Sequence, residues 1–314
     1  MMQFRTIVRP ISTDIRIDHR TAVIMLGSCF SDNIGRKLAE RMFHVVINPL
    51  GTVYNPASIA EVIRIMTGER QISLSEFFLH EGLWRHFLCH SSLARPDRGD
   101  AEQALNMALA AARHTVEHRN AVAVLTLGTA RVFEREGKIV SNCHKLPGTG
   151  FNRRLLSVDE ATMHIDTAVS LLAQWLPGIR VILTVSPIRH MECGLEGNSL
   201  SKAVLRIACQ NIADTNTSVV YFPAFEALTD DLRDYRFYDA DMKHPSAVAV
   251  DYVYELFEQS VMSETTRRLA AEALSLTRRL AHRPMSPDPD AVRQFAAKTE
   301  LLKESFFREH PELT

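Results

Sequence analysis

Two short stretches of the sequence carry residue types that could perform chemistry together. Ser28 follows the apolar run Ala-Val-Ile-Met-Leu-Gly and precedes a stretch with helical periodicity. Far along the chain, Asp241-Met-Lys-His244 places a carboxylate and an imidazole three residues apart, on the same side of a turn. The carboxylate can fix the tautomer of the imidazole, whose other nitrogen then accepts a proton from a hydroxyl. Serine, histidine and aspartate in these roles would form the triad of a nucleophilic hydrolase.

Each of these residues also has a plainer explanation. Ser28 could simply cap the helix that follows it, and Asp241 could cap the helix that begins after Pro245. Cys29 is an alternative nucleophile, because it lies near the same helix end, where thiols become more reactive. An adjacent residue in a tight turn should point elsewhere, so Cys29 is expected in the core, like Cys143.

The apolar pattern predicts five strands that alternate with helices. Continuous apolar runs, typical of strands buried on both faces, occur at 22–27, 44–47, 121–127, 180–185 and 218–222. Helical periodicity is found at 32–42, 58–66, 158–175, 199–212 and 246–260. This alternation predicts an α/β fold with a parallel sheet between helices. Because ligands bind beyond the carboxyl ends of such strands, the Ser28 and His244 loops should meet there.

The chain divides into a body and a tail. Residues 1–264 form the predicted α/β domain, in which 68–118 is interpreted as an insertion or flap rich in aromatic residues and histidines. The most economical account of these histidines is a folded flap with hydrogen-bonded imidazoles, without a metal site. Residues 265–314 hold two amphipathic helices, at 265–282 and 291–307. They should form a helical hairpin that packs on itself, on the body or on a second subunit. In the last case the protein would be a homo-oligomer.

Composition excludes several classes of protein. The 314 residues are 46% hydrophobic and 23% charged, as in ordinary globular proteins. A formal net charge of −1 gives no general attraction to nucleic acid or to an anionic membrane. Five cysteines without paired spacing argue against disulfides and against structural zinc. With neither a secretory signal nor a membrane span visible, we expect a cytoplasmic protein without metal or cofactor.

The motifs also resemble a known family. Gly27-Ser28-Cys29-Phe30 is the name-giving motif of the GSCFA family, within the SGNH (GDSL-like) hydrolase superfamily. The resemblance covers most of residues 20–260 and includes the segments 48–56, 142–145, 186–190 and 241–245. It implies a flavodoxin-like three-layer α/β/α fold with a five-stranded parallel sheet, of SGNH-hydrolase type. It also implies ester or acyl-transfer chemistry.

Four sequence blocks of the superfamily can be carried over to this chain. The nucleophile falls on Ser28, and the last block falls on Asp241 and His244. The second block implies an oxyanion donor at the amide of Gly51, beside the amide of Ser28. The third block usually holds an asparagine, which is missing from Gly128-Thr129-Ala130. Either the hydroxyl of Thr129 or the side chain of Asn142 is expected to replace it.

The sequence therefore predicts a serine hydrolase of SGNH type. It would be an esterase or deacetylase that acts on a small or carbohydrate-linked acyl ester through an acyl-enzyme. An acyltransferase with the same triad remains an alternative, as does a binding module that kept only the crevice. The residues expected to contact an anionic substrate or acceptor are His144, Lys145, Arg189 and His190.

Overall fold

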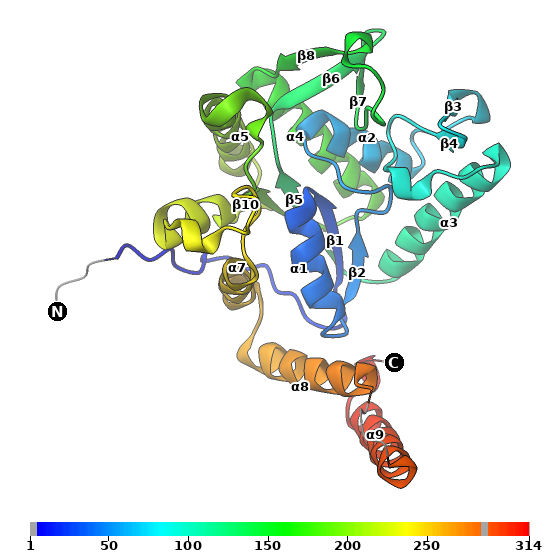
Figure 1. Ribbon diagram of the computed structural model, residues 1–314. Coiled ribbons are helices and arrows are strands. Elements are labelled where there is room, and N and C mark those ends of the chain that lie inside the picture. The colour runs from blue at the N-terminus through cyan, green and yellow to red at the C-terminus, as the bar shows by residue number, and fades with distance from the viewer. Residues whose placement is uncertain (1–4, 284–287, 314) are drawn as a thin grey trace.

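A five-stranded parallel sheet forms the centre of the molecule, which we describe from a computed structural model for residues 5–283 and 288–313 (Figure 1). Its strands are β1 (Ala22–Gly27), β2 (His44–Ile47), β5 (Ala121–Leu127), β9 (Arg180–Val185) and β10 (Val219–Tyr221). The spatial order is β2-β1-β5-β9-β10, which is the flavodoxin-like arrangement. The predicted fold class is confirmed, and the strand order reverses between β1 and β5.

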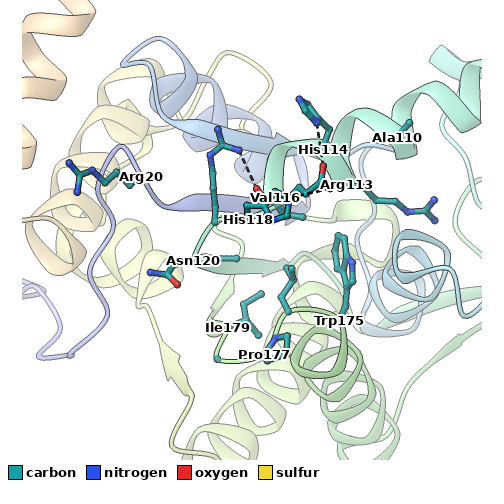
Figure 2. A pocket seen from close by; sticks show the side chains of 15 residues that line it. Arg20, Ala110, Arg113, His114, Val116, His118, Asn120, Trp175, Pro177 and Ile179 are labelled. Atoms are coloured by element: carbon teal, nitrogen blue, oxygen red, sulfur yellow. Dashed lines mark hydrogen bonds and ion pairs between the residues drawn. The ribbon is translucent and has the colours of Figure 1, made fainter. Parts of the chain in front are cut away.

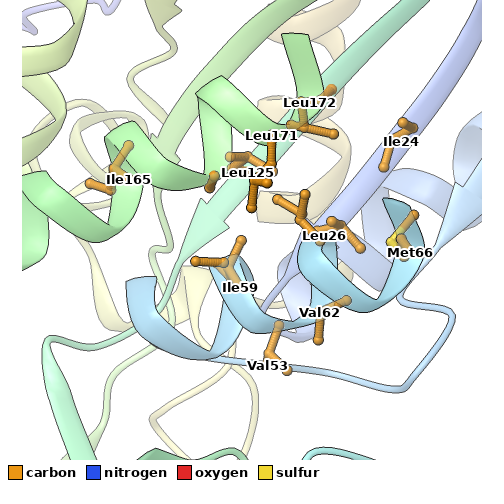
Figure 3. Packing of buried hydrophobic residues seen from close by; sticks show 14 of the residues in the cluster. Ile24, Leu26, Val53, Ile59, Val62, Met66, Leu125, Ile165, Leu171 and Leu172 are labelled. Atoms are coloured by element: carbon orange, nitrogen blue, oxygen red, sulfur yellow. The ribbon is translucent and has the colours of Figure 1, made fainter. Parts of the chain in front are cut away.

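Helices cover both faces of this sheet. On one face lie α1 (Cys29–Ala39) and α7 (Ala247–Val261); on the other lie α2 (Pro56–Thr67), α3 (Arg98–Val116), α4 (Val158–Trp175) and α5 (Gly194–Thr215). Successive strand side chains point to opposite faces. Val23 and Met25 therefore pack with α1 and α7, whereas Ile24 and Leu26 pack with α2 and α4. Figure 3 shows this second core, in which Ile59 and Leu172 approach Leu26 and Leu125.

Smaller elements surround the sheet. A hairpin is formed by β6 (Arg131–Arg135) and β7 (Lys138–Val140), and β8 (Asn152–Leu155) pairs with β6. Glu136 and Gly137 turn this hairpin with φ of 52° and 74°, as its two-residue loop requires. A second small sheet holds β3 (Phe78–His80) and β4 (Leu83–Arg85), and the short helix α6 (Ala224–Glu226) leads into a π-type turn at Ala227–Leu232.

The segment expected to be an insertion, 68–118, is only partly a surface feature. Its β3–β4 ribbon lies beside the body, but α3 belongs to the helical layer (Figure 1). Leu105, Leu109 and Val116 of α3 are buried in the same core as β1 and β5. The second half of this segment therefore builds the core and is not a flap.

The tail consists of α8 (Glu264–Ala281) and α9 (Pro289–Glu309), which extend away from the sheet (Figure 1). Ala270 of α8 joins the core on the α7 side. Arg279 of α8 donates to Thr299 of α9 at 3.0 Å, and its guanidinium lies over the ring of Phe295. The two helices thus pack on each other and α8 packs on the body; part of the predicted connection, 284–287, lies outside the described residues. No helix within the described ranges is long and apolar enough to cross a membrane.

Candidate active site

The Asp241–His244 pair is formed as the sequence predicted. His244 donates from Nδ1 to Asp241 Oδ2 at 2.5 Å, and Asp241 Oδ1 accepts the amides of Lys243 and His244 at 2.9 Å each. These bonds from His244, first from its amide and then from its ring, hold the pKa of Asp241 far below its ordinary value. The carboxylate thus stays ionised and fixes the tautomer in which Nε2 of neutral His244 is an acceptor.

The loop that carries this pair is fastened to the end of β9. The amide of Arg189 donates to the carbonyl of Lys243 at 3.1 Å, and Tyr238 and Pro245 pair as an isolated bridge. Both side chains of the Asp241–His244 pair remain about 45% exposed. The imidazole is therefore held in place on one side and open to solvent on the other.

The turn between β1 and α1 is held by the contacts of the Gly27 backbone with β5 and with the side chain of Asn48. Gly27 has φ of 136°, and a Cβ built there would lie 2.1 Å from the carbonyl oxygen of Thr126 on β5. The amide of Gly27 donates to Asn48 Oδ1 at 2.8 Å, and Asn48 Nδ2 donates to Asp32 at 2.7 Å. Only glycine allows β1 and β5 to approach so closely at this conformation.

Ser28 is completely buried in this turn. Its side chain caps α1 by accepting the amide of Phe30 at 3.3 Å, and its hydroxyl donates to Ser186 at 2.9 Å. Ser186 lies directly after β9, so the predicted nucleophile is bonded to another strand end. No hydrogen bond joins His244 to Ser28 within the described part of the chain. The helix-capping explanation of Ser28 is therefore confirmed, and its role as nucleophile stays a prediction.

Cys29 is the first residue of α1. It was expected in the core but is only half-buried. Its thiol lies 3.8 Å from the hydroxyl of Tyr54. Its amide donates to no other group of the described residues, as is usual in the first turn of a helix. A thiol and a free helix-terminal amide are thus presented together at the carboxyl edge of β1.

Tyr54 connects Cys29 with His190. The rings of Tyr54 and His190 meet edge to face with centroids 5.4 Å apart, and burial raises the pKa of Tyr54 to about 12. Burial, reinforced by Lys202 and His244, lowers the pKa of His190 to about 4. Nε2 of His190 is buried without a hydrogen-bond partner in the described structure, above Gly128. The neutral imidazole of His190 therefore lies between the β1–α1 turn and the loop that carries His244.

The expected oxyanion donors are arranged differently from the prediction. The amide of Ser28 donates to Thr126 at 3.2 Å, and the amide of Gly51 donates to Asn48 at 2.7 Å, so neither is free. The hydroxyl of Thr129 pairs with Ser201 at 2.9 Å. Asn142 has a buried Nδ2 with no partner among the described residues, and no bond brings it to Ser28. Replacement of the missing asparagine by Thr129 is thus not supported by its contacts.

The residues expected to bind substrate fall into two groups. His144 is buried, and its ring bonds to the carbonyl of His86 at 2.9 Å, so its role is to hold the 68–118 segment. Its assignment as a substrate contact stays a prediction that these contacts do not support. Lys145 is exposed. Arg189 lies 3.9 Å from the ring centroid of Tyr238, close to the Asp241–His244 loop. Of these four residues, Arg189 and His190 lie beside the candidate triad.

Sequence reasoning missed the polar side of α5. Asn198, Ser201 and Lys202 are buried, and none of them was named as a site residue from the sequence. Their spacing of three and four residues, on the same face as Leu205 and Cys209, was the available signal. A lysine in line with core positions indicates a buried partner, which the sequence cannot name.

A large hollow lies at the opposite edge of the sheet. It has a volume of about 790 Å³ and is open at the amino ends of β5 and β9, with Arg20, His118 and Trp175 along its wall (Figure 2). It contains none of the predicted site residues. Across the described ranges, no group of three histidine, cysteine, aspartate or glutamate residues could hold a metal ion.

Comparison with known proteins agrees with the motif at Gly27-Ser28-Cys29-Phe30. Searches of curated proteins and of solved structures gave no significant match to the chain. The model of the GSCFA family matches residues 22–257, from the first residue of β1 into α7. This match contains the β1–α1 turn, the polar face of α5 and the Asp241–His244 pair. The chain therefore belongs to the GSCFA family.

Proposed function

We propose that this protein is an ester hydrolase of the SGNH type that works through an acyl-enzyme. The observation that carries the proposal is the bond from His244 Nδ1 to ionised Asp241, which leaves Nε2 as a proton acceptor. It occurs after the last strand, in a loop fastened beside β9, while α1 begins after β1 at the same edge of the sheet. The switch between β1 and β5 is where ligands bind in this fold.

The proposed reaction has two steps. A nucleophile on the β1–α1 turn attacks the ester carbonyl carbon while His244 Nε2 takes its proton, which then passes to the leaving alcohol. Water next attacks the acyl group, again with His244 as the base, and the nucleophile is regenerated. Asp241 stabilises the charged imidazole that forms in each step.

Two side chains are candidates for the nucleophile. The family resemblance assigns this role to Ser28, whose hydroxyl would have to leave Ser186 to reach a substrate. Accessibility favours Cys29, because it is half-buried and Ser28 is not exposed at all. The free amide of Cys29 at the helix N-terminus also suits an oxyanion donor. The resulting intermediate is an oxygen ester on Ser28 or a thioester on Cys29.

Hydrolysis of p-nitrophenyl acetate by Ser28→Ala and Cys29→Ala separates these candidates. Following the resemblance, we expect Ser28→Ala to abolish turnover and Cys29→Ala to retain much of it. The opposite result would assign the thiol, which mass spectrometry of the acylated peptide after an acid quench would verify. Labelling by a fluorophosphonate would assign an activated serine and exclude a binding module, because the probe reacts with activated serines. If both variants and His244→Ala turn over like the wild type, the proposal is wrong.

An acyltransferase is the second candidate function, and one contact favours it. Arg189 is fixed against Tyr238 and bonds through its amide to Lys243, so a cation stands next to the base. Such a cation would hold an anionic acceptor alcohol. Adding glycerol 3-phosphate to the assay should then divert the acetyl group to the alcohol, and Arg189→Ala should remove that diversion. Unchanged acetate release would leave hydrolysis as the function.

The acyl substrate is proposed to be a small or carbohydrate-linked ester. A cytoplasmic location is also part of the proposal. All five cysteines are free, as is usual in a reducing compartment.

A further inference from the structure

Three polar side chains of α5 are buried against the loops that carry the candidate site. Asn198, Ser201 and Lys202 lie on one face of the helix and are 8%, 2% and 2% exposed. The same face continues with Leu205 and Cys209 in the apolar core. Burying polar groups is costly unless they are hydrogen-bonded, so this face needs an explanation beyond packing.

Each of the three side chains bonds to the main chain of a strand end. Asn198 Oδ1 accepts the amide of His190 at 2.9 Å, and Ser201 Oγ accepts the amide of Ala130 at 2.7 Å. Lys202 Nζ donates to two carbonyls, those of Gly128 and Ser186, at 2.6 Å each. The helix thereby holds the segments that follow β5 and β9.

Lys202 is the central member of this group. Gly128 follows β5 and Ser186 follows β9, and these strands are neighbours in the sheet. A single ammonium group therefore joins the two strand ends on the side where the chain leaves the sheet. Ser186 Oγ in turn accepts a hydrogen bond from the hydroxyl of Ser28. Ser186 thus connects the Lys202 cross-link with the β1–α1 turn.

A methionine or leucine at this position would leave two buried carbonyls without donors. Such groups are rarely left unpaired in folded proteins, and their loss of partners is costly. Burial lowers the pKa of Lys202 to about 7. The cross-link does not depend on that charge, because a neutral amine still has two N–H donors for its two carbonyls.

We propose that Lys202 is a positioning residue, which fixes Ser186 and Gly128 beside the β1–α1 turn by bonding to both of their carbonyls. Its effect on turnover rests on the proposed function, whereas its effect on the two strand ends does not. Removing it should displace Ser186 from Ser28 and release the loop that carries His190.

The test compares Lys202→Met, which keeps the length of the side chain, with Lys202→Arg and with the exposed control Lys298→Met on α9. Hydrogen exchange is followed by mass spectrometry in peptides covering 126–130 and 184–190, and p-nitrophenyl acetate hydrolysis is measured alongside. In Lys202→Met, we expect exchange at least about tenfold faster in these two peptides only. We expect kcat to fall at least about tenfold with KM within about twofold, and Lys298→Met to match the wild type.

The Arg variant keeps donors but shifts them. A positioning role predicts a folded Lys202→Arg protein with an intermediate kcat, whereas a purely structural role predicts the wild-type kcat. Lys202→Arg therefore decides the question if Lys202→Met does not fold. Wild-type exchange in both peptides of a folded Lys202→Met, or an equal increase throughout the chain, would overturn the inference. If the wild type hydrolyses no ester, the proposed function fails, and the exchange comparison alone decides the role of Lys202.

Discussion

The amino and carboxyl edges of the sheet differ in how their polar residues are buried and hydrogen-bonded. The amino edge has a hollow of about 790 Å³, but its polar residues are mostly exposed and Arg113 is already engaged in capping α2. At the carboxyl edge, buried polar groups are bonded across different elements, Ser28 to Ser186 and Lys202 to Gly128, and the half-exposed His244–Asp241 pair lies at the same edge. Two strongly perturbed pKa values, those of Lys202 and His190, also belong to the carboxyl edge.

The burial and hydrogen bonding of polar groups, and not the volume of a hollow, are our reason to place the proposed function at the carboxyl edge. Exposed arginines and histidines cost little and can be replaced freely. Buried polar groups have to be satisfied by specific partners, and perturbed groups cluster where chemistry is carried out. The following predictions test this difference, from the carboxyl edge, where we expect the largest effects, to the amino edge.

Loss of the base should have the largest effect. His244→Gln removes the Nε2 acceptor, and we expect kcat/KM for p-nitrophenyl acetate to fall about 10³-fold, the usual range for a general base. His118→Gln, at the amino edge, is the matched control and should leave the rate unchanged. Equal rates in the two variants would contradict the proposed role of the carboxyl edge.

A methyl group on Gly27 should have the next largest effect. Its Cβ would overlap the Thr126 carbonyl, which is backbone and cannot turn aside. We expect Gly27→Ala to lower the free energy of unfolding by about 3 kcal/mol or more. Gly178→Ala is the control, because it has φ of 83° but nothing within 4 Å, so only strain of about 1 kcal/mol applies. Urea denaturation measures both, and similar losses would show that the approach of β1 to β5 is not tight.

Stability should depend on pH through Lys202. Its folded pKa of about 7 is below the ordinary value of 10.5, so between these values the unfolded chain binds a proton that the folded chain has released. The free energy of unfolding of the wild type, measured relative to Lys202→Met, should therefore rise with pH, by about 2 kcal/mol from pH 7 to pH 9. Urea denaturation at the two pH values measures this difference. A flat or falling difference would mean that Lys202 keeps its proton in the folded state.

The smallest effect is expected at the amino edge itself. Arg20→Ala and His114→Ala remove exposed polar side chains from the wall of the hollow, and neither residue contacts the candidate triad. We expect kcat/KM to change by less than about twofold in each variant, without loss of stability beyond about 0.5 kcal/mol. A larger loss of turnover would show that this edge takes part in the reaction.

The sequence by itself determined the sheet and the Asp241–His244 pair. Residues 22–27 are apolar without a break and residues 121–127 are apolar except for Thr126, and such runs are typical of strands buried between two layers of helix. The pair needed only local information, because three residues of a turn bring its two side chains together. The turn at Glu136-Gly137 was equally local, since it depends on backbone conformations that few residues adopt.

Only the tertiary structure decided how the residues around that pair are used. Ser28 bonds to Ser186, and Lys202 bonds to Gly128, across sequence separations of 158 and 74 residues. A sequence pattern states which residue is polar but not which distant carbonyl or hydroxyl will satisfy it. Whether Ser28 or Cys29 faces solvent likewise depends on the direction in which α1 leaves β1. The close approach of Gly27 to Thr126 sets that direction, because packing of β1 against β5 fixes the backbone there.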